Sequence, residues 1–318
     1  MTACVILAAG QGKRMRSELP KVVHPVLGEP MVLRVVRQAL AAGLEDPVVV
    51  VGHGRDLVIP ILRRHGIRWA VQEEQLGTAH AVSCGIEGAA ADSFTILLGD
   101  VPLLESSTIC MLEERRRETG AAVAILTAEP PETAGYGRVL REGTALRGIV
   151  EDRDCSPEQL GIGEINTGLM SFDGGLLPEL LQRVDRDNDQ GEFYLTDTVS
   201  AAAAMGLECI AVKAADYMEV SGINDRVQLS RATDHLREKV VTRHLLEGVD
   251  IPDPGSVWIE ESVGIGTGVF IGRSVRLSGG TVIGDGCRIG DGCVIEDRTV
   301  EAGSVIEPYT VMGWEGPA

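Results

Sequence analysis

The first 225 residues alternate between short apolar runs and longer segments with helical periodicity. The runs are CVILAA (4–9), PVVVVG (47–52), FTILLGD (94–100) and AAVAILTA (121–128). Unbroken apolar runs of this length are typical of strands buried on both faces of a parallel sheet. Between two of them, PMVLRVVRQALAAG (30–43) starts with proline and ends with glycine, as helices commonly do. This alternation predicts a doubly wound α/β domain with its ligand at the carboxyl ends of the strands.

The pattern changes after residue 225. Residues 226–247 have the spacing of one long amphipathic helix, and GVDIPDPGS (248–256) then breaks it with proline and glycine. We therefore expect an α/β domain over 1–225, a linker helix over 226–250 and a separate domain over 251–318.

Aliphatic residues recur at every sixth position in the last part of the chain. One row comprises Ile259, Ile265, Ile271, Leu277, Ile283, Ile289 and Ile295, and a second row two residues earlier comprises Val257, Val263, Val269, Val275, Thr281, Cys287 and Cys293. This period predicts a parallel β-helix with three short strands in each coil of about 18 residues. About three coils fit, with a slip of one residue after Ile295. Cys287 and Cys293 would be small buried fillers of the inner row rather than metal ligands.

Composition limits the possible partners. Aromatic residues make up only 3% of the chain, so the core must consist of Val, Ile, Leu and Ala. A net charge of −18 disfavours nucleic acid and anionic membranes, and any anionic substrate must meet a local group of cations. Seven cysteines without a C-x-x-C pair suit reduced thiols. With no signal peptide and no membrane-spanning run in view, we expect a cytoplasmic protein.

The loop LAAGQGKRM (7–15) directly follows the first predicted strand. Gly10 and Gly12 would let backbone N–H groups face an anion, and Lys13, Arg14 and the later Lys21 add positive charge. The loop is neither a Walker A sequence nor a dinucleotide fingerprint, because Met15 stands where the third glycine would be. Taken alone, it indicates a phosphate-binding loop and a plain strand–helix connection equally well.

Other stretches add candidate chemistry. QEEQLGTAHA (72–81) places a side-chain amide, a glycine and a threonine after a predicted strand, as a site that reads a base edge would need. Asp100 ends a buried strand, where either an Mg²⁺ ligand or a helix cap is expected. The segments TAGYGRV, GIVEDRD, EINTGLM, QGEFYLTD and VSGINDR then follow, each with small or polar residues.

These segments, in this order, resemble the N-terminal half of the bifunctional bacterial N-acetylglucosamine-1-phosphate uridylyltransferases. The resemblance covers nearly all of residues 1–250 and rests on at least eight motifs. It implies a Rossmann-like nucleotidyltransferase domain. In this family, a left-handed parallel β-helix follows that domain, which agrees with the hexapeptide period.

The resemblance also implies a nucleotide-binding set. The uracil and ribose would be lined by Leu7, Ala8, Ala9, Gly10, Gln72, Gly77 and Thr78. Arg14 and Lys21 would contact the triphosphate, and Asp100 with Asn224 would hold Mg²⁺. Arg14, Lys21 and Asp100 are therefore the expected catalytic residues.

A second set would bind the acetylated sugar: Gly137, Glu151, Asn166, Tyr194 and Thr196. Tyr194 could instead be a core residue and Asn166 a turn residue. His24, His53 and His80 are interpreted as structural, because the implied chemistry needs no imidazole.

The implied reaction joins UTP and N-acetylglucosamine 1-phosphate to give UDP-N-acetylglucosamine and pyrophosphate. The attacking phosphate is already an anion, so positioning and charge neutralisation are the main requirements. Leu98 and Arg153 stand where the family usually has tyrosine and lysine, which leaves the sugar open. The alternatives are another sugar-1-phosphate nucleotidyltransferase, using glucose 1-phosphate or dTTP, and a catalytically silent regulatory protein that binds sugar nucleotides.

The family's second activity, acetyl transfer, is not expected from these residues. Residues 257–318 contain no His and no Lys, and acetyl transfer to an amine usually needs a histidine base. The sequence also stops before the positions that carry this activity in the family. The resemblance further implies a homo-oligomer, with a trimer favoured.

Overall fold

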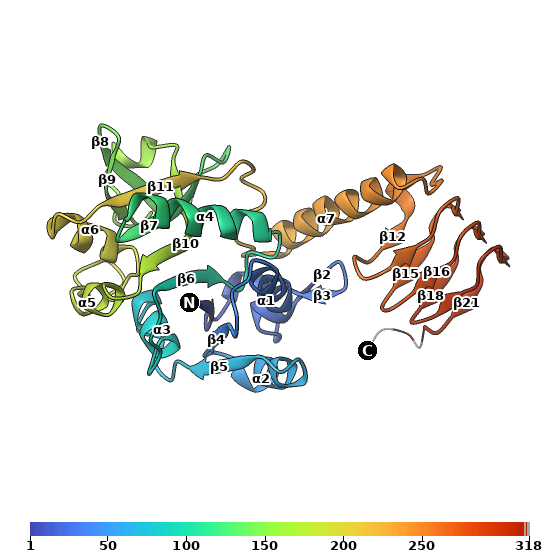
Figure 1. Cartoon of the computed structure of the whole chain (residues 1–318), viewed down its shortest axis with the longest axis horizontal. Coiled ribbons are helices and arrows are strands. Elements are labelled where there is room, and N and C mark those ends of the chain that lie inside the picture. The colour runs from blue at the N-terminus through green and yellow to red at the C-terminus, as the bar shows by residue number, and fades with distance from the viewer. Residues whose placement is uncertain (315, 317–318) are drawn as a thin grey trace. The chain divides into compact units, whose positions relative to one another are not determined.

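The computed structural model describes residues 1–314 and 316. It divides into two compact units (Figure 1). The first contains Met1–His24 and Pro30–Arg226, and the second contains Pro25–Glu29 and the chain from Val227 onward. Each unit is described separately below.

A mixed sheet forms the centre of the first unit. Its strands are β1 (Thr2–Ala8), β4 (Val48–Val51), β5 (Arg68–Val71), β6 (Ser93–Leu98), β7 (Val123–Ala128), β10 (Ile165–Asp173) and β11 (Cys209–Lys213), in the order β11-β7-β10-β6-β1-β4-β5. The hairpin of β8 (Arg138–Glu142) and β9 (Ala145–Val150) joins it through the start of β10. The four predicted runs all form strands, and the α/β fold class is confirmed.

Strand β10 differs from the parallel pattern that the sequence predicted. It lies antiparallel between β6 and β7, whereas β1 is parallel to β4 and β6. Because β10 runs in the opposite direction, its first residues lie at the sheet edge where β6 and β7 end. Asn166 therefore pairs with Thr127, near the end of β7, and reaches the edge at which Asp100 follows β6.

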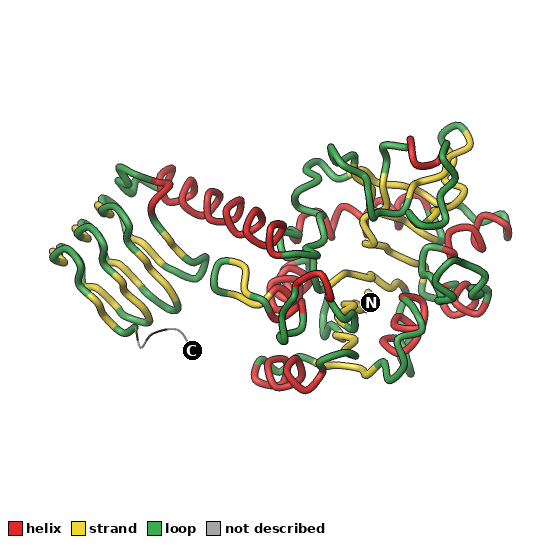
Figure 2. The backbone as a smooth tube through the Cα atoms, turned by 180° about the vertical axis from the view of Figure 1, so that it is seen from behind, coloured by secondary structure: helices red, strands yellow, loops and turns green. Residues whose placement is uncertain are grey.

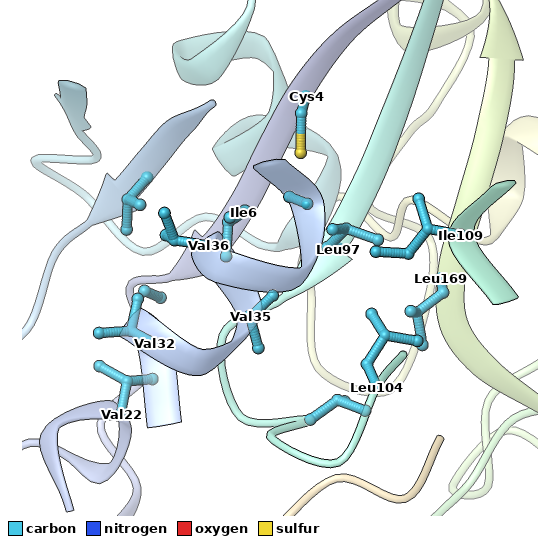
Figure 3. Close-up of a cluster of buried hydrophobic side chains, with 14 of the residues drawn as sticks. Cys4, Ile6, Val22, Val32, Val35, Val36, Leu97, Leu104, Ile109 and Leu169 are labelled. Atoms are coloured by element: carbon cyan, nitrogen blue, oxygen red, sulfur yellow. The ribbon is translucent and has the colours of Figure 1, made fainter. Parts of the chain in front are cut away.

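Helices cover both faces of this sheet. They are α1 (Met31–Ala41), α2 (Arg55–Arg64), α3 (Thr78–Gly85), α4 (Ser106–Thr119), α5 (Leu177–Gln182) and α6 (Asp197–Ala204), with short 3₁₀ turns at Lys13–Met15, Lys21–Val23 and Gln159–Gly161. Successive residues of a strand point to opposite faces, so Ile6 joins the core cluster of α1 while Val5 joins that of α3. Figure 3 shows the α1 cluster, in which Val32, Val35 and Val36 lie near Ile6.

The second unit contains α7 (Arg226–Leu246) from Val227 onward and a parallel β-helix. Short β2 (Pro25–Val26) and β3 (Glu29–Pro30) occur earlier in the chain, and a 3₁₀ turn (Pro254–Ser256) follows α7. The strands of the β-helix are β12 (Trp258–Ile259), β13 (Gly264–Ile265), β14 (Phe270–Ile271), β15 (Arg276–Ser278), β16 (Val282–Ile283), β17 (Arg288–Ile289), β18 (Val294–Glu296), β19 (Thr299–Val300), β20 (Val305–Ile306) and β21 (Val311–Met312). Successive coils stack strand upon strand (Figure 2).

The hexapeptide period predicted this stacking. Ile259 pairs with Leu277, which is 18 residues later, while Ile283 pairs with Val300, 17 residues later, as the one-residue slip requires. The inner rows are buried, although Ile265 is only half-buried. Cys287 and Cys293 are fully buried and donate to the carbonyls of Glu301 and Glu307. They fill the inner row, as predicted.

Across the part of the chain that the structure describes, no helix is both long enough and apolar enough to cross a membrane.

Candidate active site

Three predicted residues from distant segments meet at the edge of the sheet. Asp100 follows β6, and its carboxylate pairs with the ammonium group of Lys21. The same Lys21 Nζ donates to Asn224 Oδ1 at 3.1 Å, and Ile223 N donates to the backbone carbonyl of Asp100 at 2.9 Å. The side chains of Lys21 and Asp100 are 13% and 19% exposed, so this charged group is largely shielded from bulk water.

The arrangement of these oxygens fits a small divalent cation. Asp100 Oδ2 and Asn224 Oδ1 both point at the one nitrogen of Lys21, so they converge on a position that already holds positive charge. Carboxylate and amide oxygens are hard ligands, and Mg²⁺ usually takes only a few protein ligands together with substrate phosphates and water. Within the described residues, no group of three His, Cys, Asp or Glu side chains could hold a metal ion. Asp100 and Asn224 are a carboxylate–amide pair that could hold Mg²⁺ together with substrate oxygens and water.

The glycine-rich loop lies against Lys21. Gly12 has a left-handed backbone, with φ of 59°, and a Cβ atom there would be 2.6 Å from the Cβ of Lys21. Gly12 is thus required both by the turn and by the close approach of Lys21. A Cβ atom on Gly10 would meet nothing within 4 Å, so its backbone faces open space. Arg14 is exposed on the following 3₁₀ turn, where a polyanion could reach it.

The predicted base-binding residues form a second group. Gln72 is 3% exposed, and its Nε2 lies 3.0 Å from Gly77 O and 3.1 Å from His80 Nδ1. Gly77 has a φ of 117°, and a Cβ atom there would lie 2.6 Å from Phe193 N. Leu195 N also donates to Thr78 Oγ1 at 2.8 Å. The segment 192–196 is therefore fixed against the segment 77–79.

Leu7, Ala8 and Ala9 belong to the end of β1 and the start of the loop. Ala8 and Ala9 are buried, and the backbone carbonyl of Leu7 accepts from Gly99 N at 2.9 Å. Small side chains here keep β1 close to the segment that carries Asp100. The loop and the metal-binding pair consequently share one edge of the sheet.

The predicted sugar-binding residues form a third group. Thr196 Oγ1 donates to Glu151 Oε1 at 3.0 Å, and Asn166 N donates to Gly137 O at 2.8 Å. Asn166 Oδ1 is buried and has no hydrogen-bond partner among the described residues. Leaving such an acceptor unpaired costs free energy, so it is available for a ligand donor such as a sugar hydroxyl or an amide N–H. Tyr194 is buried nearby, and its hydroxyl accepts from Gln190 Nε2 at 2.7 Å.

This third group is acidic. Burial raises the pKa of Glu151, the hydrogen bond from Thr196 lowers it, and the carboxylates of Asp197, Asp154 and Asp152 raise it further. Burial also raises the pKa of Asp197 to about 6, with Asp185 and Asp154 adding to the effect. Carboxylates accept hydrogen bonds from sugar hydroxyls and repel phosphates. The phosphate groups of a bound ligand are therefore expected near Lys21 rather than near this group.

The raised pKa of Asp197 gives a test of this electrostatic environment. The folded protein keeps the proton on Asp197 to higher pH than the unfolded chain does, so ionisation costs stability as the pH rises from about 4 to about 6. We expect Asp197→Asn to gain stability relative to wild type across this window. Urea unfolding at pH 4, 5, 6 and 7 measures it. Asp56→Asn, an exposed aspartate in the first turn of α2, is the matched control, and an equal gain there would contradict the assignment.

In the segment TAGYGRV (133–139), only the second glycine, Gly137, was predicted to belong to the site. Arg138 in this segment is 2% exposed and pairs with Asp152 at 3.1 Å, which ties β8 to the loop that carries Glu151. Tyr136 is half-buried. Burial raises its pKa, the hydrogen bond with Ser221 lowers it and the Asp100 carboxylate raises it again. Tyr136 directly precedes Gly137 and lies within electrostatic range of the Asp100 carboxylate. Its position between Gly135 and Gly137 was the sequence feature that could have marked it as a site residue.

The two positions that depart from the family pattern lie in different environments. Leu98 contacts Gly168, where a Cβ atom would clash with the leucine side chain, so Leu98 occupies space between β6 and β10. Arg153 is exposed. Leu98 therefore has the more direct effect on the shape of the interior.

Comparison with known sequences shows which families this chain resembles. The profile of the MobA-like NTP transferase domain matches residues 4–154, and the bacterial transferase hexapeptide profile (six repeats) matches residues 262–297. The bifunctional protein GlmU of Syntrophotalea carbinolica is 47% identical over 266 residues, which are 83% of this chain and 57% of that protein. The chain belongs to the GlmU family of nucleotidyltransferases.

Other GlmU proteins match at a similar level. The GlmU of Streptomyces avermitilis is 43% identical, over 83% of this chain and 56% of that protein. The chain thus spans a little over half of the length of these curated relatives.

Solved structures support the fold. A UDP-glucose pyrophosphorylase complexed with UDP-glucose superposes with a TM-score of 0.60 at 16% identity, over 75% of this chain and 99% of that one. A nucleotidyl transferase from Methanothermobacter thermautotroptrophicus gives 0.53 at 20% identity, with the same coverage.

Proposed function

We propose that this GlmU homologue joins UTP and N-acetylglucosamine 1-phosphate to give UDP-N-acetylglucosamine and pyrophosphate. The observation that carries the proposal is the meeting of Lys21, Asp100 and Asn224 beside Tyr136, which adjoins Gly137. In this proposal, the cationic, metal-compatible group binds the phosphates and the acidic group that includes Gly137 and Glu151 binds the sugar. A sugar phosphate could then direct its phosphate toward the cations and its hydroxyls toward Glu151 and Asn166.

In the proposed reaction, a phosphate oxygen of the sugar 1-phosphate attacks the α-phosphorus of UTP. The new phosphorus–oxygen bond forms as the bond to pyrophosphate breaks, and the bonding electrons leave with pyrophosphate. Lys21 and Arg14 reduce the repulsion between the two anionic substrates and stabilise the charge that builds up on the leaving group. Asp100 and Asn224 would hold Mg²⁺, which when bound supplies further neutralisation of the phosphate oxygens.

Sugar recognition depends on Thr196 and Glu151 in this proposal. The hydroxyl of Thr196 directs one oxygen of Glu151 and leaves the other oxygen for the sugar. Thr196→Val keeps the shape but removes this hydrogen bond. We expect the KM for the sugar phosphate to rise about tenfold, as the loss of one hydrogen bond to a charged group implies, with the KM for UTP nearly unchanged. Steady-state kinetics with each substrate varied in turn measure both, and an equal change in both would contradict the assignment.

The test of the function is pyrophosphate release with Mg²⁺ and UTP across several sugar 1-phosphates. The panel contains N-acetylglucosamine, N-acetylgalactosamine, glucose and glucosamine 1-phosphates, and dTTP is compared with UTP. Preference for N-acetylglucosamine 1-phosphate supports the proposal. Preference for another sugar, or for dTTP, would leave the nucleotidyltransferase assignment in place and change the proposed substrate. Leu98 would then be the first position to examine. UTP binding without turnover would favour a regulatory protein.

The proposal covers uridylyl transfer alone. Residues 257–318 contain no His or Lys, so this part of the chain offers no imidazole base for acetyl transfer, and we propose that it does not carry that activity. We also propose that the protein acts in the cytoplasm as a homo-oligomer, with a trimer favoured by the hexapeptide repeats. Light scattering of the purified chain tests the trimer, and acetyl-CoA consumption with glucosamine 1-phosphate tests the missing activity.

A further inference from the structure

The side-chain amide of Gln72 is held by two acceptors on the same short segment. Its Nε2 lies 3.0 Å from the backbone carbonyl of Gly77 and 3.1 Å from Nδ1 of His80. A carbonyl oxygen can only accept, so the amide atom that faces Gly77 must be the nitrogen. The hydrogen bond to Gly77 therefore fixes the positions of the amide nitrogen and the amide oxygen of Gln72.

The second contact then fixes the state of His80. An amide nitrogen carries two hydrogens and accepts none, so His80 Nδ1 must carry a lone pair and accept one of them. The other ring nitrogen, Nε2, lies 3.8 Å from the sulfur of Cys84, one helical turn later on α3. Burial raises the pKa of the Cys84 thiol, which keeps the sulfur uncharged. The proton of a neutral His80 consequently resides on Nε2.

Both hydrogens of the Gln72 amide are used in this arrangement, and its oxygen is not. Gln72 is 3% exposed, and among the residues that the structure describes no donor bonds to its Oε1. The free group of this buried amide is thus an acceptor. A flipped amide would set oxygen against both the Gly77 carbonyl and the His80 lone pair, so the arrangement resists reversal.

We infer that His80 is a positioning residue that holds the Gln72 amide with its oxygen toward the nucleotide base. The inference rests on the proposed function, which places uracil at Gln72. A base in this position must donate from its ring nitrogen, as N3–H of uracil and thymine does. Cytosine has an unprotonated N3 at this position, so two acceptors, N3 and Gln72 Oε1, would face each other without a hydrogen between them. His80 therefore contributes to selection of UTP over CTP although it need not touch the base.

Two substitutions at His80 separate this role from simple packing. His80→Leu removes one of the two acceptors that hold the amide nitrogen, so only the Gly77 carbonyl then opposes reversal of the amide, and a reversed amide would donate to cytosine. His80→Asn can place Oδ1 close to the former position of Nδ1 and restore the acceptor. We expect the ratio of kcat/KM for UTP to that for CTP to fall about tenfold in the leucine variant, the value of one hydrogen bond, and to recover in the asparagine variant. His65→Leu changes an exposed histidine directly after α2; it is the control and should leave the ratio unchanged.

The outcomes distinguish the inference from the proposed function. A wild-type protein that does not prefer UTP over CTP would overturn the uracil assignment itself. A wild-type preference that His80→Leu leaves unchanged would overturn the role of His80 alone. The tautomer gives a readout that needs neither turnover nor a variant: ¹⁵N NMR of the ligand-free protein should show His80 protonated on Nε2. Protonation on Nδ1 in the neutral ring would overturn the inference.

Discussion

Asp100→Asn is expected to lower the rate of pyrophosphate release by about 10²–10³-fold, the usual cost of removing one group that stabilises transition-state charge. The asparagine still accepts a hydrogen bond from Lys21, so the local structure should persist. It lacks the negative charge that Mg²⁺ requires, and the loss should therefore appear mainly in kcat. Pyrophosphate release at saturating substrates and varied Mg²⁺ measures it.

The matched control for this prediction is Asp46→Asn. Asp46 also forms an ion pair, with Arg68, but the pair is exposed and lies away from the loop and the sugar-binding group. We expect this variant to keep wild-type turnover and nearly wild-type stability, because exposed ion pairs contribute little. Unchanged turnover in Asp100→Asn, at every Mg²⁺ concentration, would show that the carboxylate does not take part in the reaction.

Gly77→Ala is expected to reduce both stability and UTP binding. A φ of 117° is nearly exclusive to glycine, and forcing another residue into such a conformation costs about 1–3 kcal/mol. The added Cβ atom also runs into the backbone of Phe193, which would push the segment 192–196 away from Thr78. We therefore expect a lower free energy of unfolding in urea and a rise of about tenfold or more in the KM for UTP.

Gly88→Ala separates the two causes. Gly88 also has a left-handed backbone, with φ of 71°, but a Cβ atom there would meet nothing within 4 Å. It should lose about 1 kcal/mol of stability through backbone strain and keep its KM for UTP. If Gly77→Ala behaves like Gly88→Ala, the contact with Phe193 does not organise the nucleotide site.

The candidate site is explained largely by the direction of one strand. A parallel strand in the place of β10 would present Asn166 at the opposite edge of the sheet from Asp100. The antiparallel orientation brings the start of β10 to the carboxyl ends of its neighbours, together with Gly137 of the adjoining segment. The apolar residues of EINTGLMSFD indicate a strand, but strand periodicity is the same in both directions. The direction therefore could not be predicted from this segment.

Local periodicity by itself determined much of this protein. The four apolar runs predicted buried strands, PMVLRVVRQALAAG predicted α1, and the six-residue repeat predicted a β-helix and even its one-residue slip. Such patterns suffice to predict helices and strands, because the spacing of apolar residues over a few positions decides which face of the element is buried. The order of the motifs further identified the family. Residue patterns alone indicated a candidate phosphate-binding loop and a candidate metal ligand at Asp100, each with an alternative open, and the resemblance then gave the roles of single residues.

Tertiary structure decided which of these residues meet. Lys21 and Asp100 are 79 positions apart, and Asn224 lies 203 positions beyond Lys21, so no local pattern could place their polar atoms around one point. The same holds for Gly77 and Phe193, and for Arg138 and Asp152, where the half-buried aspartate pairs with the buried arginine. The sequence interpretation of His80 as purely structural followed from the chemistry of the reaction. Its contact with the Gln72 amide depends on the turn at Gly77. That turn brings the Gly77 carbonyl and the His80 imidazole within hydrogen-bond distance of the same atom, Gln72 Nε2.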